Sequence, residues 1–197
     1  MDQLDDADLA DDPGDGIDEY WRLRTSLSEA LAEIGQAAVG PLVEALRSTN
    51  PRTRAYAARA LGMTGARQAY EPIVALLTDE VDDIDRVQFI DALGELGDPR
   101  AIDVLLRYLK TPQQVHRGWL VRVAANALGK IGTEAVIDPL AEVLGTDADW
   151  FARLGAAEGL CRIQSPRAAD VLRKALHDED VRVRAAAEAG MCDKLGR

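Results

Sequence analysis

The chain has 197 residues, 47% of them hydrophobic but only 5% aromatic, and a formal net charge of −11. Most of this charge lies at the start, because residues 1–20 contain nine carboxylates and no Lys or Arg, whereas residues 21–197 contain 25 acidic and 23 basic residues. A nearly neutral body argues against nucleic-acid binding, which normally requires a basic surface.

The sequence lacks the features that indicate secretion, a membrane span or a disulfide framework. It contains no run of 18 apolar residues, no apolar stretch after its acidic start and only two cysteines. We therefore expect no signal peptide, no membrane span and no disulfide framework, and we expect the protein to be cytoplasmic.

The first elements in chain order differ from everything that follows. Residues 1–16 have no apolar periodicity and are predicted to form an acidic disordered tail, which would bind arginines of the body, block its binding face or only maintain solubility. Residues 17–34 are predicted to form a single capping helix with Tyr20 and Trp21 at its start. Residues 17–197 are expected to form one repeat domain.

One short pattern recurs along the rest of the chain. Ala-Leu-Gly-x-x-Gly occurs at 60–65, 92–97 and 127–132, and weaker copies occur at 30–35 and 159–164. The leucines of these copies stand at positions 31, 61, 93, 128 and 160. A period of about 30 to 35 residues is the signature of a solenoid, in which each unit packs only on its neighbours.

Each copy is predicted to contain two helices, which we call A and B. Helix B ends at the pattern, and its closing glycine suits a left-handed helix cap. Helix A carries apolar residues in the phase i, i+3, i+4, such as Leu105, Tyr108 and Leu109. One hairpin buries too little surface to fold alone, so we predict an all-α solenoid of about five hairpins plus the N-terminal capping helix.

Three features together resemble a known repeat. They are the end of helix B, the Asp98-Pro99-Arg100 start of helix A, and the Val-Arg pair at the head of helix B, as in Val181-Arg182. They resemble HEAT-like repeats, and in particular the short, alanine-rich type named after the phycobilisome (PBS) lyases. This resemblance implies the stacked fold but leaves the function open, because such repeats occur in many unrelated proteins.

The residues that commonly carry chemistry are few and isolated. His116 and His177 lie in different turns, and Cys161 and Cys192 are expected to fill small buried positions on consecutive B helices. We expect no catalytic residue, no metal site and no cofactor. Whether the protein is an enzyme stays open, with a non-catalytic role favoured.

Outward positions of the B helices do not repeat, although the core positions do. We predict that they form a surface for a protein partner, with these residues: Tyr56, Arg59, Gln88, Asp91, Trp119, Asn126, Lys130, Glu158 and Arg162. Trp119 has a second interpretation, in which it packs between repeats. A row of arginines near the heads of the B helices is expected to bridge neighbouring repeats: Arg54, Arg86, Arg122, Arg153 and Arg184.

The favoured function is a non-catalytic scaffold or adaptor that binds a protein partner on a concave face formed by the B helices. We expect no nucleic-acid or membrane partner. The oligomeric state stays open, and a monomer is compatible with the sequence. Two alternatives are a phycobilin-lyase-like factor that delivers or attaches a chromophore, and a nucleic-acid-binding repeat protein.

Overall fold

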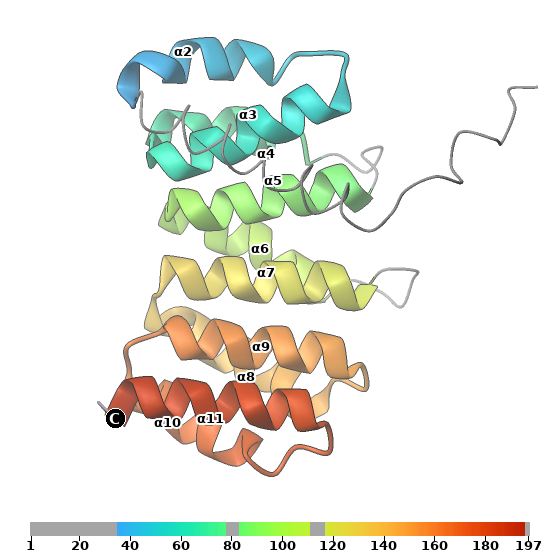
Figure 1. Cartoon of the computed structure of the whole chain (residues 1–197), viewed down its shortest axis with the longest axis vertical. Coiled ribbons are helices and arrows are strands. Elements are labelled where there is room, and N and C mark those ends of the chain that lie inside the picture. The colour runs from blue at the N-terminus through green and yellow to red at the C-terminus, as the bar shows by residue number, and fades with distance from the viewer. Residues whose placement is uncertain (1–34, 78–82, 111–116, 196–197) are drawn as a thin grey trace, which may run out of the picture.

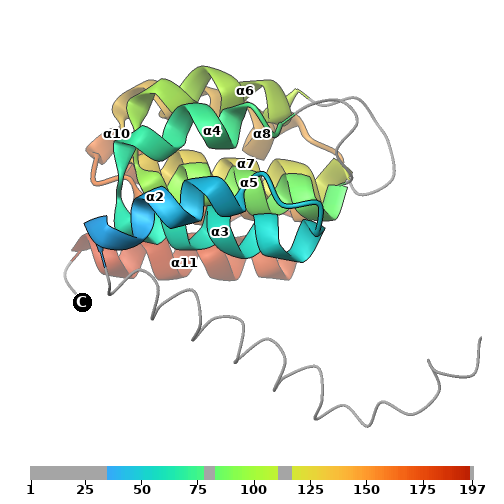
Figure 2. The same ribbon diagram turned by 90° about the horizontal axis from the view of Figure 1, so that it is seen from above.

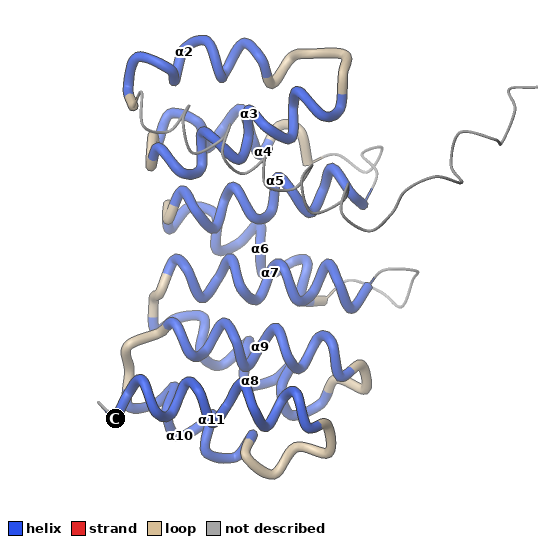
Figure 3. Tube along the Cα trace, in the orientation of Figure 1, coloured by secondary structure: helices blue, strands red, loops and turns tan. Residues whose placement is uncertain are grey.

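A computed structural model of the chain describes residues 35–77, 83–110 and 117–195 (Figure 1). The predicted tail (1–16) and capping helix (17–34) lie outside the described residues. Helices and turns account for everything described, and none of these residues forms a strand (Figure 3). Within the same residues, no helix has both the length and the apolar character that crossing a membrane requires.

In the described part of the chain, five helical hairpins follow one another in chain order. Their A and B helices pair as α2 (Gln36–Ala45) with α3 (Pro51–Thr64), α4 (Tyr70–Val74) with α5 (Asp83–Leu96), α6 (Ile102–Leu109) with α7 (Arg117–Ile131), α8 (Ile137–Thr146) with α9 (Trp150–Arg162), and α10 (Pro166–Ala175) with α11 (Val181–Leu195). Short 3-10 turns lead into three of the A helices: η2 (Arg67–Ala69), η3 (Pro99–Ala101) and η4 (Glu134–Val136).

The helices are arranged in two layers. Figure 1 shows the B helices α3, α5, α7, α9 and α11 stacked in chain order, with α4, α6 and α8 behind them. Each B helix packs on the next, and each A helix packs on the B helix of its own hairpin. The same two layers are seen from the end of the stack in Figure 2. This is the predicted α-solenoid.

Small residues let successive B helices approach closely. A Cβ atom added to Gly94 would lie 2.6 Å from the Cα atom of Ala127, and one added to Gly129 would collide with Gly159. The leucines of the repeat pattern lie beneath this contact, and Leu61, Leu93 and Leu128 are fully buried, as predicted. Close approach and leucine burial together form one continuous core.

The predicted helix ends are confirmed. Gly65 and Gly132 close two B helices with φ of 64° and 73°, in the left-handed region that glycine adopts without strain. Asp98 and Ser165 each accept a hydrogen bond from the backbone N–H two residues later. Ser165 begins α10 directly, whereas Asp98 begins η3, which then continues into α6.

Candidate binding groove

A groove crosses the outer face of the B-helix layer over α5 and α7. We call it the B-helix groove, and its lining residues are Arg59, Val87, Gln88, Asp91, Trp119, Arg122, Val123, Asn126, Lys130 and Arg162. Its volume is about 320 Å³. An adjoining hollow of about 750 Å³ shares three of these residues and extends to Ala186, Ala189 and Gly190 on α11. Such volumes are typical of ligand sites in proteins, which occupy roughly 300–1,000 Å³.

The groove brings together most of the residues predicted to contact a partner. Seven of them line it: Arg59, Gln88, Asp91, Trp119, Asn126, Lys130 and Arg162. Glu158 lines the adjoining hollow, whereas Tyr56, on α3, lines neither. Trp119 is half-buried, packs against the core and also borders the groove, which combines its two predicted roles. Partner binding by these residues stays a prediction.

Lys130 is held at one side of the groove by two carboxylates. Its Nζ atom lies 2.6 Å from Oδ1 of Asp91 and 2.8 Å from Oε1 of Glu95, both on α5. Arg59 reaches the same Asp91 from α3, with 3.9 Å between Nη1 and Oδ2. These ion pairs join three successive B helices and fix the ammonium group before any ligand arrives.

Arg122 and Glu158 form a second charged cluster between α7 and α9. The Nε and Nη2 atoms of Arg122 donate to the Glu158 carboxylate at 3.0 and 2.7 Å, and Asn126 donates to it at 2.7 Å. The Arg122 guanidinium also lies 4.6 Å above the ring of Phe151. Burial of Glu158 raises its pKa, but hydrogen bonds from Arg122 and Asn126 outweigh burial, and the pKa lies below its usual value.

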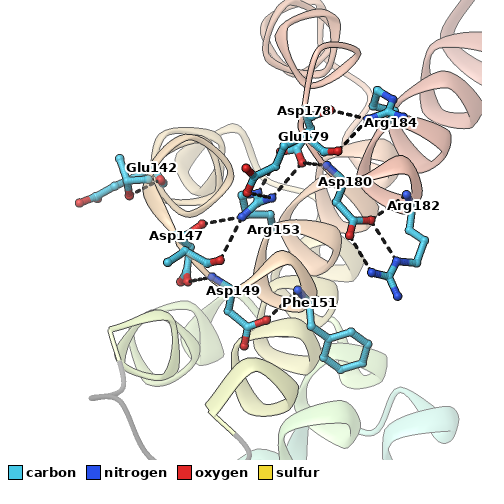
Figure 4. Close-up of polar contacts among 12 residues, drawn as sticks. Glu142, Asp147, Asp149, Phe151, Arg153, Asp178, Glu179, Asp180, Arg182 and Arg184 are labelled. Carbon is cyan, nitrogen blue, oxygen red and sulfur yellow. Dashed lines mark hydrogen bonds and ion pairs between the residues drawn. The ribbon is translucent and has the colours of Figure 1, made fainter.

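The expected bridging of neighbouring repeats is confirmed at Arg54, Arg122 and Arg153. Arg54 binds Asp85 of the next hairpin at 2.9 Å, and Arg153 binds Asp178 at 2.9 and 3.0 Å (Figure 4). Arg122 bridges to Glu158 of the next hairpin and also borders the groove, because Val121 holds the matching position of the repeat and Arg122 is turned one residue further around α7.

Two cations of the groove retain unused hydrogen-bonding capacity. Arg162 is exposed and has no hydrogen-bond or ion-pair partner within the described ranges, although its charge helps to lower the pKa of Glu158. The Nε atom of Arg59 is buried without an acceptor. Arg162 is therefore the better placed of the two to bind an anionic ligand, since the Nε atom of Arg59 is inaccessible.

Cys161 differs from its expected environment. Its thiol is half-buried and borders the hollow beside the groove, where Sγ lies 3.3 Å from the Ala186 carbonyl oxygen. The sequence predicted a small, buried position for it, near the glycine-rich end of its B helix. Across the parts of the chain that the structure describes, no three His, Cys, Asp or Glu side chains form a cluster suited to a metal ion.

Several lining residues were not predicted. Val87 and Val123 form apolar parts of the groove, and Ala186 and Ala189 extend the hollow onto α11. Val123 shares its repeat position with the predicted Gln88, and the same count of positions from the repeated leucines places it on the outer side of α7. The alanines on α11 carry no signal that separates them from core alanines.

A family model of HEAT repeats matches residues 16–90, 41–124, 82–161 and 119–192. The chain belongs to the HEAT-repeat family. It is 30% identical over 157 residues to the bilin biosynthesis protein PecF of Nostoc sp. PCC 7120, an alignment that covers 75% of this chain and 90% of PecF. It is also 34% identical over 142 residues to the phycocyanobilin lyase subunit alpha of Picosynechococcus sp.. That alignment covers 66% of this chain and 51% of the lyase subunit.

The fold has a counterpart among solved structures. One chain in the structure of the complex of CpcE and CpcF of phycocyanin lyase, from Nostoc sp. PCC 7120, superposes on this chain with a TM-score of 0.59 at 22% identity. The superposition covers 79% of this chain and 64% of that chain. The repeats are thus of the PBS lyase HEAT-like type, as the sequence indicated. The favoured interpretation as a plain scaffold is wrong, since the relatives are bilin biosynthesis and lyase proteins.

Proposed function

We propose that this chain is a bilin-handling subunit of the phycobilin-lyase type, which holds an open-chain tetrapyrrole for delivery or attachment to an acceptor protein. The observation that carries the proposal is the 30% identity to PecF across 90% of that protein. The alignment also covers 75% of this chain, so it includes most of the stacked hairpins whose B helices line the groove.

The chemistry of the B-helix groove supports the same ligand class. An open-chain tetrapyrrole is long, flat and conjugated, and it carries propionate side chains. Trp119, Val87 and Val123 offer aromatic and apolar surface for its rings. Arg162 is exposed and offers its guanidinium to one of the ligand's carboxylates.

The paired cations have a different role in the proposed site. Lys130 and Arg122 already bind carboxylates of the protein, which fixes their side chains and keeps the local charge nearly balanced. Such a preorganised rim lowers the entropy that ligand binding would otherwise cost. We assign these two residues to positioning the groove and not to direct neutralisation of the ligand.

We also propose that the chain works with a protein partner, in addition to its acceptor. A structure of two related chains in complex, CpcE with CpcF, supports this part of the proposal by analogy of fold. Contact between such a partner and the rim of the groove would explain why the outward positions of the B helices differ from repeat to repeat.

Titration with phycocyanobilin tests the proposed ligand. We expect the visible absorbance of the bilin to shift and to saturate at one bilin per chain. The dimethyl ester of the same bilin, which lacks free carboxylates, is expected to bind at least about tenfold more weakly, equal to about 1.4 kcal/mol. Absence of any spectral change with the free acid would overturn the proposed function.

A further inference from the structure

The B-helix groove and its adjoining hollow form a basic area on a body that is not basic. The residues that line them include four bases and two acids: Arg59, Arg122, Lys130 and Arg162, and Asp91 and Glu158. Residues 21–197 as a whole contain 25 acidic and 23 basic residues, so acids predominate outside the groove. An anion that approaches the protein is therefore drawn to this face more than to the rest of the body.

The positive charge of the groove is most accessible at Arg162. Lys130 lies 2.6 Å from Asp91 and Arg122 lies 2.7 Å from Glu158, so carboxylates of the protein already neutralise these two bases. Arg162 is exposed and forms no hydrogen bond or ion pair with the described residues. It stands in the last turn of α9, as Lys130 stands in the last turn of α7. Arg162 is thus an open anchoring point for a carboxylate.

Another segment of the same chain carries the matching charge. Residues 1–20 contain nine carboxylates and no Lys or Arg, and we call them the acidic segment. Apolar side chains are interspersed among these acids, since Leu4 and Leu9 each stand within two positions of an aspartate. An open-chain tetrapyrrole likewise combines carboxylates with apolar groups, and Trp119 and Val123 of the groove suit the apolar part of either one. The acidic segment and the proposed ligand are therefore complementary to the same surface.

The chain enters α2 at the edge of the stack where the B helices end. The side chain of Gln68, which follows the end of α3, lies beside that of Gln36 at the start of α2, with 3.5 Å between Nε2 and Oε1. Figure 1 shows α3, α5, α7 and α9 side by side and ending at this same edge. Lys130 and Arg162, in the last turns of α7 and α9, therefore lie on the side of the stack from which residues 1–34 lead into α2.

The sequence between the acidic segment and α2 is long enough to reach the groove. Neighbouring helices pack about 8–10 Å apart, so α9 lies about 24–30 Å from α3 along the stack. Residues 21–35 span up to about 50 Å when extended, and the predicted capping helix over residues 17–34 would span about 27 Å. Either length brings the acidic segment to α7 and α9, where Lys130 and Arg162 line the groove.

We propose that the acidic segment occupies the B-helix groove when no bilin is bound and competes with the bilin for Arg162. This inference rests on the proposed function, because it assigns a regulation to the same groove. Attachment within one chain gives the segment an effective concentration on the order of millimolar, so weak contacts between carboxylates and a guanidinium keep the groove occupied in part of the molecules. The apparent affinity for the bilin then falls in proportion to the fraction of chains whose groove is open.

An intramolecular photocrosslink tests the contact without any bilin. A benzophenone amino acid at Leu9 of the full chain is expected to crosslink within the same molecule to α7 or α9, near Trp119 or Arg162. Arg162→Glu is expected to lower the yield at least about threefold, because like charges then face each other. Arg173→Glu, at an exposed residue of α10, is the matched control and leaves the yield unchanged. Crosslinks only to the A-helix layer, only between copies of the chain, or to nothing would overturn the proposal.

Neutralising the acidic segment tests the competition. The full chain with five Asp→Asn changes is expected to bind phycocyanobilin at least about threefold more tightly at low salt, and the gain is expected to shrink at high salt, which screens exposed charges. The changes are at Asp5, Asp6, Asp8, Asp11 and Asp12. The matched control removes one exposed acid from each A helix and is expected to leave the affinity unchanged: Glu44→Gln, Glu71→Gln, Asp103→Asn, Glu142→Gln and Asp170→Asn. No gain after neutralising the segment, or an equal gain in the control, would refute the competition.

The proposed function and the proposed competition fail in different ways. A crosslink from Leu9 to the groove, with no bilin binding by either the wild-type or the neutralised chain, would refute the proposed function and leave the contact standing. Bilin binding of equal strength in these two chains would refute the competition and leave the proposed function standing. We expect the crosslink in the groove together with tighter bilin binding after neutralisation.

Discussion

The two sides of the B helices follow opposite rules. Their inner side repeats the same small and apolar residues, as at Ala58, Ala125 and Ala157, all fully buried. Their outer side changes from helix to helix at one repeat position, from Arg59 to Asp91 and Asn126. Repetition therefore specifies how hairpins stack, and departure from repetition specifies what the stack binds.

Gly94→Val tests the inner side and has the largest expected effect. The new side chain would collide with the backbone of Ala127, so α5 and α7 would have to separate. We expect the free energy of unfolding to fall by about 3 kcal/mol or more, as measured by urea denaturation. Gly145→Ala is the matched control, because an added Cβ there meets no atom within 4 Å. An unchanged midpoint for Gly94→Val would contradict close packing between B helices.

Arg153→Ala has the next largest expected effect. It leaves Asp178, whose side chain is 9% exposed, without its charged partner. Breaking a buried pair in this way typically costs about 3 kcal/mol, and thermal or urea unfolding would measure it. Arg173→Ala removes an exposed pair with Asp170 and is expected to cost less than about 0.5 kcal/mol. An equal loss of unfolding free energy in both variants would show that the bridging arginines do not stabilise the stack.

Lowering the pH tests the same Arg153–Asp178 ion pair, with a smaller expected change in the free energy of unfolding. Burial of Asp178 raises its pKa, but hydrogen bonds from Arg153 outweigh burial and hold the pKa below its usual value. The stabilisation is therefore present above the unfolded pKa of about 3.9 and is lost as the pH falls through the folded pKa. We expect the free energy of unfolding of the wild-type protein to decrease below about pH 4. The free energy of unfolding of Asp178→Asn is expected to decrease less over the same interval. A decrease of the same size in Asp178→Asn would rule out this carboxylate as a source of acid sensitivity.

The sequence predicts the stack better than the groove. Burial of Leu61, Leu93 and Leu128 could be predicted because each leucine lies in a hairpin whose contacts are local and repeated. The position of Arg122 at the groove could not be predicted in this way, since one residue of difference on a helix turns a side chain by about 100°. The start of α6 through a 3-10 turn also escapes the pattern, because Asp98-Pro99 caps both kinds of helix.

The outer surface could be located but not interpreted from the sequence. Counting positions from the repeated leucines was enough to bring Arg59, Asp91 and Arg162 into one groove. The same count gives no ligand, because mixed charge on a helix face suits a protein partner and a small anion equally well. Comparison with bilin biosynthesis and lyase proteins decided against the plain scaffold.

The affinity of Arg162→Ala for phycocyanobilin tests the central claim most directly. Arg162 is exposed and forms no hydrogen bond or ion pair with the described residues, so its removal is expected to leave the free energy of unfolding within about 0.5 kcal/mol of the wild-type value. The dissociation constant is expected to rise about tenfold, corresponding to about 1.4 kcal/mol, while Arg173→Ala leaves it unchanged. If Arg162→Ala and the wild-type protein had the same dissociation constant, the bilin would bind outside this groove.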